Sequence, residues 1–132
     1  LRVQLVAERA AHAAERRRLA SRARELSRRN RDLRRGVRPS VAEAYTLAAI
    51  TYGVPRAELV RVAACESTHN PHARNGQFLG LFQLGDGFRV RSPYFPALSP
   101  WSPYANALAA ARVVARAGWS EWECSPRGPF RR

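Results

Sequence analysis

Long stretches of this chain place apolar residues with the spacing of an α-helix. Residues 1–35 contain neither glycine nor proline and consist mainly of the strong helix formers Ala, Arg, Leu and Glu, which predicts one long helix. Four leucines in it share one heptad position: Leu5, Leu19, Leu26 and Leu33. The helix is therefore a candidate coiled coil, although arginines occupy the second seam position of the earlier heptads. Packing on the domain, or on a missing partner helix, is an equal alternative.

Three shorter helices are predicted after the first. Ser40 has the spacing of a capping box and precedes an apolar run, so a helix is expected to start at Val41 and to end near Tyr52. A second helix, opened by Pro55, is expected to end at Asn70-Pro71. The third covers residues 104–117 and stops at a glycine. The predicted fold class is mainly α.

Between these helices, residues 71–103 are rich in Gly, Pro, Asn and aromatic residues and predict mostly loop. Only residues 79–84 are apolar enough to form an element. The expected organisation is a basic arm over residues 1–38, a domain over 39–126 and a disordered tail over 127–132.

Charge is concentrated in the arm. All 23 basic residues are arginines, the net charge is +13, and residues 1–38 hold 13 arginines against four acids. Such a balance attracts polyanions, among them nucleic acid, anionic lipid surfaces and acidic cell-wall polymers. No apolar run approaches the roughly 18 residues that cross a bilayer.

Two cysteines, Cys65 and Cys124, are too few for a zinc site and are not spaced as a redox pair. They predict a disulfide and hence an exported protein. The alternative is two buried thiols in a cytosolic protein.

Glu66 differs from the other carboxylates of the domain because it ends an apolar helix and precedes a polar, loop-rich stretch. Partial desolvation there would raise its pKa and keep it protonated, as a general acid requires. The alternative is a helical glutamate bonded to nearby backbone amides. His69 and His72 are interpreted as exposed loop residues, and neither a metal nor a cofactor is predicted.

Several short motifs occur in an order that resembles the soluble lytic transglycosylases and their goose-type lysozyme relatives. The matching fragments are Tyr52-Gly53-Val54, Glu66-Ser67, Asn70-Pro71 and Gly80-Leu81-Phe82-Gln83. A cysteine directly before Glu66, and another near a Trp-rich end, are similar to the resuscitation-promoting factors of actinobacteria. The two resemblances span residues 41–125, but the Ala-Tyr-Asn-Ala-Gly segment usual in transglycosylases is missing.

This resemblance implies a lysozyme-like domain in which Glu66 protonates the β-1,4 bond between N-acetylmuramic acid and N-acetylglucosamine. The sugar's own 6-hydroxyl would then attack, leaving a 1,6-anhydro end and requiring no second carboxylate. A hydrolytic lysozyme that uses Asp86 is the alternative chemistry, although Gly85-Asp86-Gly87 is typical of a turn.

The resemblance also assigns roles to neighbours of Glu66. Ser67 and Gln83 would orient Glu66 or the sugar, and Asn106 would support the structure. The aromatic candidates for stacking on sugar faces are Phe82, Tyr94 and Tyr104, with Phe95 and Trp101. The implied location is secreted or attached to the cell wall.

The expected partners are peptidoglycan strands and anionic wall polymers, with self-association through the arm. Two other classes of protein remain open. One is a nucleic-acid binder, which the basic arm suggests, although no reading motif is present and no specific nucleic acid is expected. The other is a wall-binding module that holds glycan without cutting it.

Overall fold

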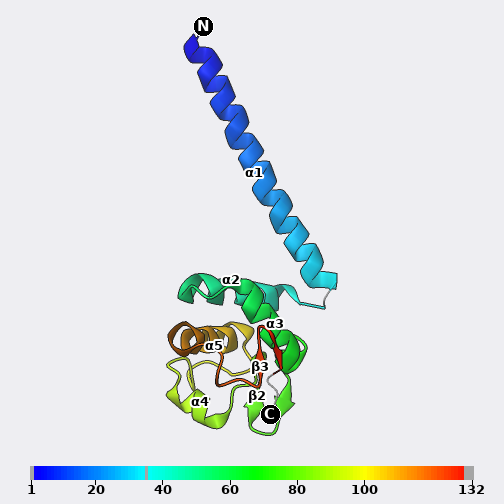
Figure 1. Ribbon diagram of the computed structural model, residues 1–132, viewed down its shortest axis with the longest axis vertical. Coiled ribbons are helices and arrows are strands. Elements are labelled where there is room, and N and C mark those ends of the chain that lie inside the picture. The colour runs from blue at the N-terminus through cyan, green and yellow to red at the C-terminus, as the bar shows by residue number, and fades with distance from the viewer. Residues whose placement is uncertain (1, 35, 130–132) are drawn as a thin grey trace. The chain divides into compact units, whose positions relative to one another are not determined.

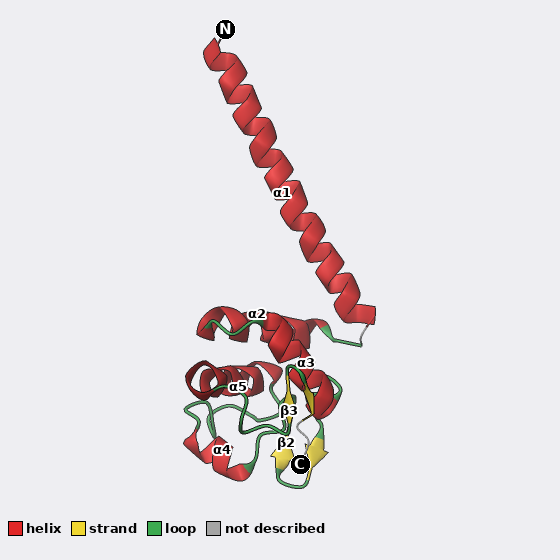
Figure 2. Ribbon diagram, in the orientation of Figure 1, coloured by secondary structure: helices red, strands yellow, loops and turns green. Residues whose placement is uncertain are grey.

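The computed structural model describes residues 2–34 and 36–129, and the chain divides into two compact units, residues 1–36 and 37–132. The fold is mainly helical, as the sequence predicts (Figure 2). Val37 is buried in the core of the second unit, so the domain begins two residues before the predicted boundary.

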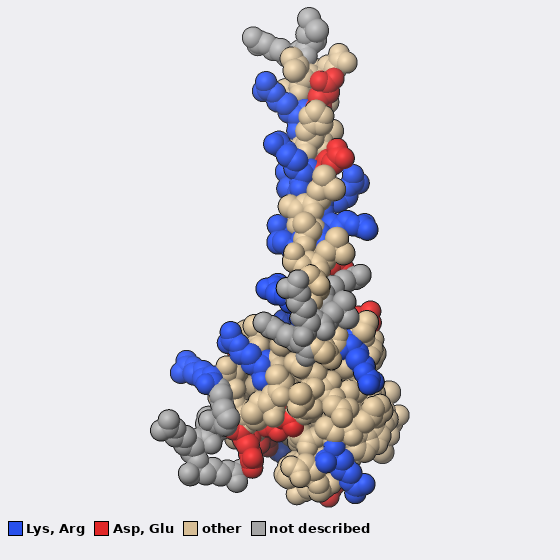
Figure 3. Space-filling view, turned by 90° about the vertical axis from the view of Figure 1, so that its right-hand side faces the viewer, with Lys and Arg blue, Asp and Glu red and all other residues tan. Residues whose placement is uncertain are grey.

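The first unit is a single helix, α1 (Arg2–Arg34), which confirms the long helix predicted for the arm (Figure 1). Five of its large apolar side chains are exposed: Val3, Leu5, Val6, Leu19 and Leu26. Arginine side chains project from opposite sides of the helix (Figure 3). Burial of the exposed apolar side chains against a partner would add to the stability of the helix, since most helical stability in proteins comes from the packing of an apolar face.

The second unit is built around three helices, α2 (Pro39–Tyr52), α3 (Arg56–Ser67) and α5 (Pro103–Ala117). The largest helix contact is between α2 and α5, which lie side by side (Figure 1). Alanines make this close approach possible, because Ala44 and Ala48 on α2 and Ala107, Ala110 and Ala111 on α5 are all fully buried. Leu59 and Val62 bring α3 into the same core.

Short elements fill the remainder of the domain. Strands β1 (Arg74–Asn75) and β2 (Phe78–Leu79) form an antiparallel hairpin, and α4 (Asp86–Arg91) follows. A second hairpin joins β3 (Cys124–Ser125) to β4 (Gly128–Pro129). Residues 79–84, predicted to form an element, are mostly turn: β2 includes only Leu79 of this stretch, and Leu84 forms an isolated bridge with Leu79. Leu81, Phe82 and Leu84 are nevertheless buried in the core.

Three sequence expectations about helix ends were wrong. Helix α2 starts at Pro39 rather than Val41, and its N-cap is Arg38, without a side-chain cap. Pro39 at the first position explains this, because its fixed φ suits a helix start and it has no N–H to cap. Helix α3 ends at Ser67, before Asn70, because Thr68 adopts the left-handed conformation with φ 53°.

Two loop expectations were also wrong. Asp86 is not a turn residue but the first residue of α4. Gly85, which precedes this helix as its N-cap, has an extended backbone conformation. In the expected disordered tail, Arg127 lies in the turn between β3 and β4, whose antiparallel pairing orders the backbone as far as Pro129. The last three residues of that tail, 130–132, lie outside the described residues.

A disulfide joins Cys65 to Cys124, as the sequence predicts. Its Cα atoms are 6.1 Å apart, and the bond closes a sequence separation of 59 residues. It fixes β3 beside the last turn of α3, and these two elements are in contact. The alternative of two free thiols is excluded.

Candidate functional site

Glu66 lies in the last turn of α3, half-buried, between the disulfide residue Cys65 and the buried Ser67. Its Oε1 accepts a hydrogen bond of 3.2 Å from the backbone N–H of Cys124. The helix that carries Glu66 is itself fixed by fully buried side chains, Leu59, Val62 and Ala63. The carboxyl group is thus held on a rigid element at the point where the C-terminal segment crosses α3.

Burial raises the pKa of Glu66 above its ordinary value of 4.5. The amide of Cys124 opposes this effect, because it favours the carboxylate that accepts its hydrogen bond. A third influence is the negative charge of Glu123, which again raises the pKa. The carboxyl also sits at the C-terminal end of a helix, where the partial negative charge of the backbone disfavours a second negative charge. Three influences therefore favour the protonated acid and one opposes it.

The structure contains one feature that favours a general acid at Glu66 and one that favours a purely structural glutamate. The raised pKa is the property that a general acid needs. The hydrogen bond from the backbone N–H of Cys124 fits the alternative interpretation, in which Glu66 is a helical glutamate bonded to backbone amides. Glu123 is a new participant, since the sequence analysis gave it no role beside Glu66. The predicted disulfide could have indicated this role of Glu123, because it brings the adjacent Cys124 beside the helix that carries Glu66.

Asn106 organises the loop that follows β2. It is fully buried, and its Oδ1 accepts a 2.8 Å hydrogen bond from the N–H of Phe82. Its Nδ2 donates to the carbonyls of Leu79 and Pro100, each at 3.0 Å. One side chain at the start of α5 therefore joins two separate loops through three hydrogen bonds. This geometry agrees with a structural role.

Gly80 allows Asn106 to come this close. It has a φ of 79°, and a Cβ placed on it would lie 2.2 Å from Nδ2 of Asn106 and 2.6 Å from the carbonyl oxygen of Pro100. Any side chain at this position would collide with both groups. The glycine of the Gly-Leu-Phe-Gln segment is thus required by close packing.

The aromatic residue Phe82 was wrongly assigned to sugar stacking. It is fully buried, with its ring 6.1 Å from that of Tyr45 and 6.2 Å from that of Trp119. Its carbonyl accepts a 2.9 Å hydrogen bond from the indole N–H of Trp122. Phe82 therefore belongs to the core, where it joins the loop to the C-terminal segment.

Ser67 and Gln83 use their polar groups within the fold. The hydroxyl of the buried Ser67 donates to the carbonyl of Ala63 at 3.0 Å, one turn back in α3. The side-chain amide of Gln83 donates to the carbonyls of Ala73 and Gly80, at 3.0 Å and 2.9 Å. Gln83 thus ties the two ends of the β1–β2 hairpin together. The roles of Ser67 and Gln83 in orienting Glu66 or the sugar stay predictions.

Asp86 and two tyrosines were further candidates. The exposed side chain of Asp86 forms an ion pair with Arg89, within α4. Half-buried Tyr94 shares a hydrogen bond with the hydroxyl of Tyr52, and burial followed by this bond raises the pKa of Tyr94 to about 12. Tyr104 donates a 2.7 Å hydrogen bond to the carboxylate of Glu43. Among the described residues, the side chains of these three bond to Arg89, Tyr52 and Glu43 rather than to Glu66.

His69 was wrongly interpreted as an exposed loop residue. It is buried, with a φ of 59°, and its Nδ1 shares a 2.7 Å hydrogen bond with the hydroxyl of the fully buried Tyr45. His72 is exposed, as expected. Within residues 2–34 and 36–129, no group of three His, Cys, Asp or Glu side chains is placed to hold a metal ion.

Comparison with family models, with curated proteins and with solved structures finds no match for this chain. In the described part of the chain, no helix is long and apolar enough to cross a membrane.

Proposed function

We propose that the domain cleaves the β-1,4 bond between N-acetylmuramic acid and N-acetylglucosamine in peptidoglycan, with Glu66 as general acid and then general base. The observation that carries this proposal is the half-buried carboxyl of Glu66, whose pKa is raised by burial and by Glu123. An acid that stays protonated nearer to neutral pH can deliver its proton to the glycosidic oxygen as the bond breaks. The ordered motifs around Glu66, and the disulfide beside it, support the choice of substrate.

The proposed product is a 1,6-anhydro end, as in a lytic transglycosylase. In this route the deprotonated Glu66 takes the proton of the sugar's 6-hydroxyl, whose oxygen attacks the anomeric carbon. The acetamido group of the substrate stabilises the positive charge, so that a second protein carboxylate is not needed. The hydrolytic alternative has less support, because Asp86 is exposed and paired with Arg89 in α4.

We further propose that the domain acts outside the cytoplasm and that α1 directs it to anionic wall polymers or to a second copy of the chain. The disulfide supports an oxidising compartment. The arginines of α1 supply the positive charge for a polyanion, and its exposed leucines supply the surface for a partner helix.

The test that separates an enzyme from a wall-binding module uses two readouts on purified, insoluble peptidoglycan. One is the amount of protein that sediments with the wall, and the other is the release of soluble fragments. The native chain and Glu66→Gln are expected to sediment equally, and only the native chain is expected to release fragments. Glu121→Gln is the matched control, because Glu121 is an exposed carboxylate that pairs with Arg91. Sedimentation without release from either chain would instead establish a binding module.

A further inference from the structure

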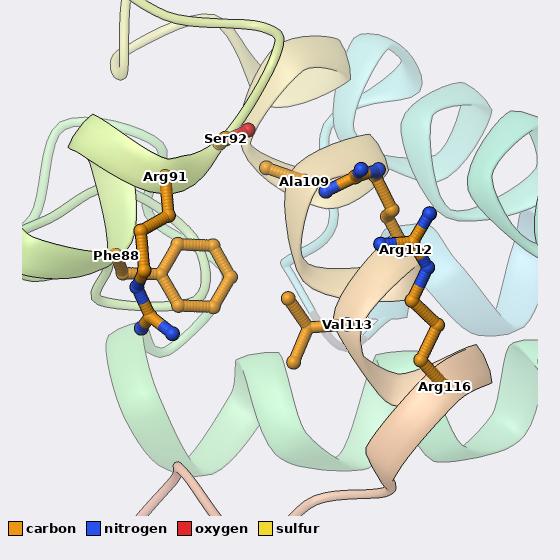
Figure 4. Close-up of a pocket in the computed structure, with 7 residues that line it drawn as sticks. All are labelled: Phe88, Arg91, Ser92, Ala109, Arg112, Val113 and Arg116. Carbon is orange, nitrogen blue, oxygen red and sulfur yellow. The ribbon is translucent and has the colours of Figure 1, made fainter.

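A hollow of about 270 Å³ lies between α4 and α5, and Glu66 and Cys124 do not line it. Phe88 on α4, together with Ala109 and Val113 on α5, provides its apolar surface. In Figure 4 the ring of Phe88 faces Val113 across the space between the two helices. The hollow is therefore separate from the site proposed for glycan cleavage.

Three arginines complete the lining. Arg91 comes from α4, whereas Arg112 and Arg116 come from the same face of α5, one turn apart (Figure 4). Like charges at this spacing repel each other and destabilise a helix by a few tenths of a kcal/mol. Arg116 also lies in the last turn of α5, where a positive charge is favourable in itself.

Of these three arginines, only Arg91 has a carboxylate partner among the described residues. Arg91 donates a 2.9 Å hydrogen bond to the carboxylate of Glu121, and its guanidinium lies 5.9 Å from the centre of the Phe88 ring. By contrast, the side chains of Arg112 and Arg116 form no hydrogen bond or ion pair with any described residue. Tyr94 lies close enough to Arg112 to interact with its charge, but Tyr94 remains a neutral phenol at physiological pH. The α5 side of the hollow therefore presents two uncompensated positive charges.

We propose that this hollow binds a phosphate ester, with the phosphate on Arg112 and Arg116 and the organic part over Phe88 and Val113. A phosphate monoester carries about −1.5 to −2 charges at pH 7, so it balances both guanidiniums, whereas one carboxylate balances a single guanidinium. Guanidinium groups also offer paired N–H donors that match the oxygens of phosphate. The volume exceeds that of a few water molecules, at roughly 30 Å³ each, and leaves room for a small organic group beside the phosphate.

A phosphate group occurs both in a soluble monoester and in the repeating units of an anionic polymer, where each phosphate is a diester with a single negative charge. The test uses the full chain, labelled with ¹⁵N, and follows backbone amide shifts as glycerol 1-phosphate is added. Saturable shifts are expected at residues of α4 and α5 around the hollow. Shifts confined to α1, or shifts that do not saturate, would overturn the proposal, since they would indicate attraction to the arginine-rich arm alone.

Paired variants make the test specific. Arg112→Gln/Arg116→Gln is expected to weaken binding at least tenfold, whereas Arg38→Gln/Arg61→Gln removes the same charge from exposed positions elsewhere on the domain and is expected to leave binding within twofold. Equal weakening by both pairs would overturn the site. Arg112→Lys/Arg116→Lys keeps the charge and the helix, so an intermediate loss is expected even if the glutamine pair were to unfold.

Two more ligands identify the chemistry and its source. Glycerate has a carboxylate in place of the phosphorylated CH₂–O group of glycerol 1-phosphate and is expected to bind at least tenfold more weakly. Equal binding would overturn the assignment to phosphate. Poly(glycerol phosphate) shows whether the natural ligand is a polymer or a soluble monoester. If it saturates the same amides at a lower phosphate concentration than glycerol 1-phosphate does, a polymer is supported. If it needs a higher concentration, a soluble monoester is supported. Glu66→Gln should bind all of these ligands normally, because the hollow does not depend on the chemistry of Glu66.

Discussion

The backbone N–H of Cys124 donates a hydrogen bond to the carboxylate of Glu66, while the sulfur of Cys124 is bonded to Cys65, the residue before Glu66. One residue of the C-terminal segment thus holds the last turn of α3 covalently and contacts its acid directly. The neighbouring Glu123 then acts on the same carboxyl through its charge. The ionisation of Glu66 depends on a segment nearly 60 residues away in the sequence.

Loss of the disulfide should lower stability and activity together. In the chain-entropy model, a closed loop of about 60 residues contributes roughly 4 kcal/mol to the free energy of unfolding. Urea denaturation with and without reductant measures this effect, and fragment release from peptidoglycan measures activity. Cys65→Ala/Cys124→Ala is the control, since reductant should not change it further. A native chain that keeps its melting temperature in reductant would show that the bridge does not stabilise the fold.

Glu123→Gln should shift the pH dependence of activity. The negative charge of Glu123 raises the pKa of Glu66, so its removal lowers that pKa. A general acid works while it is protonated, and activity is lost as pH rises through its pKa. The alkaline limb of the profile should therefore move to lower pH in Glu123→Gln and stay in place in Glu121→Gln. An unchanged limb in both variants would mean that another group controls it.

Gly80→Ala should destabilise the domain far more than Gly76→Ala. Both glycines have a positive φ, 79° and 61°, so each alanine incurs a backbone cost of about 1–2 kcal/mol. A Cβ on Gly76 meets nothing within 4 Å, whereas one on Gly80 collides with the side chain of Asn106 and with the carbonyl of Pro100. The added collision should cost a further 1–3 kcal/mol. Denaturant unfolding of both variants measures the difference, and equal losses would contradict the packing described around Asn106.

Removal of residues 1–36 should weaken binding to whole cell walls more than cleavage of short glycans. Thirteen arginines precede residue 39, and 12 of them would be removed while Arg38 remained. Val37 belongs to the core, so the cut leaves the domain intact. Sedimentation with walls at two salt concentrations tests the electrostatic part, because screening should reduce the advantage of the full chain. Equal binding by the two chains would show that α1 does not contribute to wall binding.

The helices and the disulfide were predictable because their signals are local and redundant. The arm lacks helix breakers, and the apolar spacing of residues 104–117 closely matches α5. Two cysteines allow a single pairing within the chain. Glu66 stood out because its position at the end of an apolar helix already implied partial desolvation.

The environment of individual side chains was less predictable, because it depends on tertiary contacts. Phe82 lies two residues after Gly80 in a loop-rich stretch, and only the packing of Tyr45 and Trp119 around it shows that it is buried. The loop position of His69 gave no indication of its bond to Tyr45. Glu123 could be connected to Glu66 only through the course of the chain after the disulfide.

Mass spectrometry of the soluble products that the native chain and Glu66→Gln release from purified peptidoglycan tests whether Glu66 is the acid of a glycan-cleaving enzyme. We expect 1,6-anhydro-muramyl ends from the native chain and none from Glu66→Gln. Reducing ends from the native chain alone would keep Glu66 as the acid but make water the attacking group. Products of equal amount from both chains would contradict the assignment of Glu66, and the absence of products from either would contradict glycan cleavage.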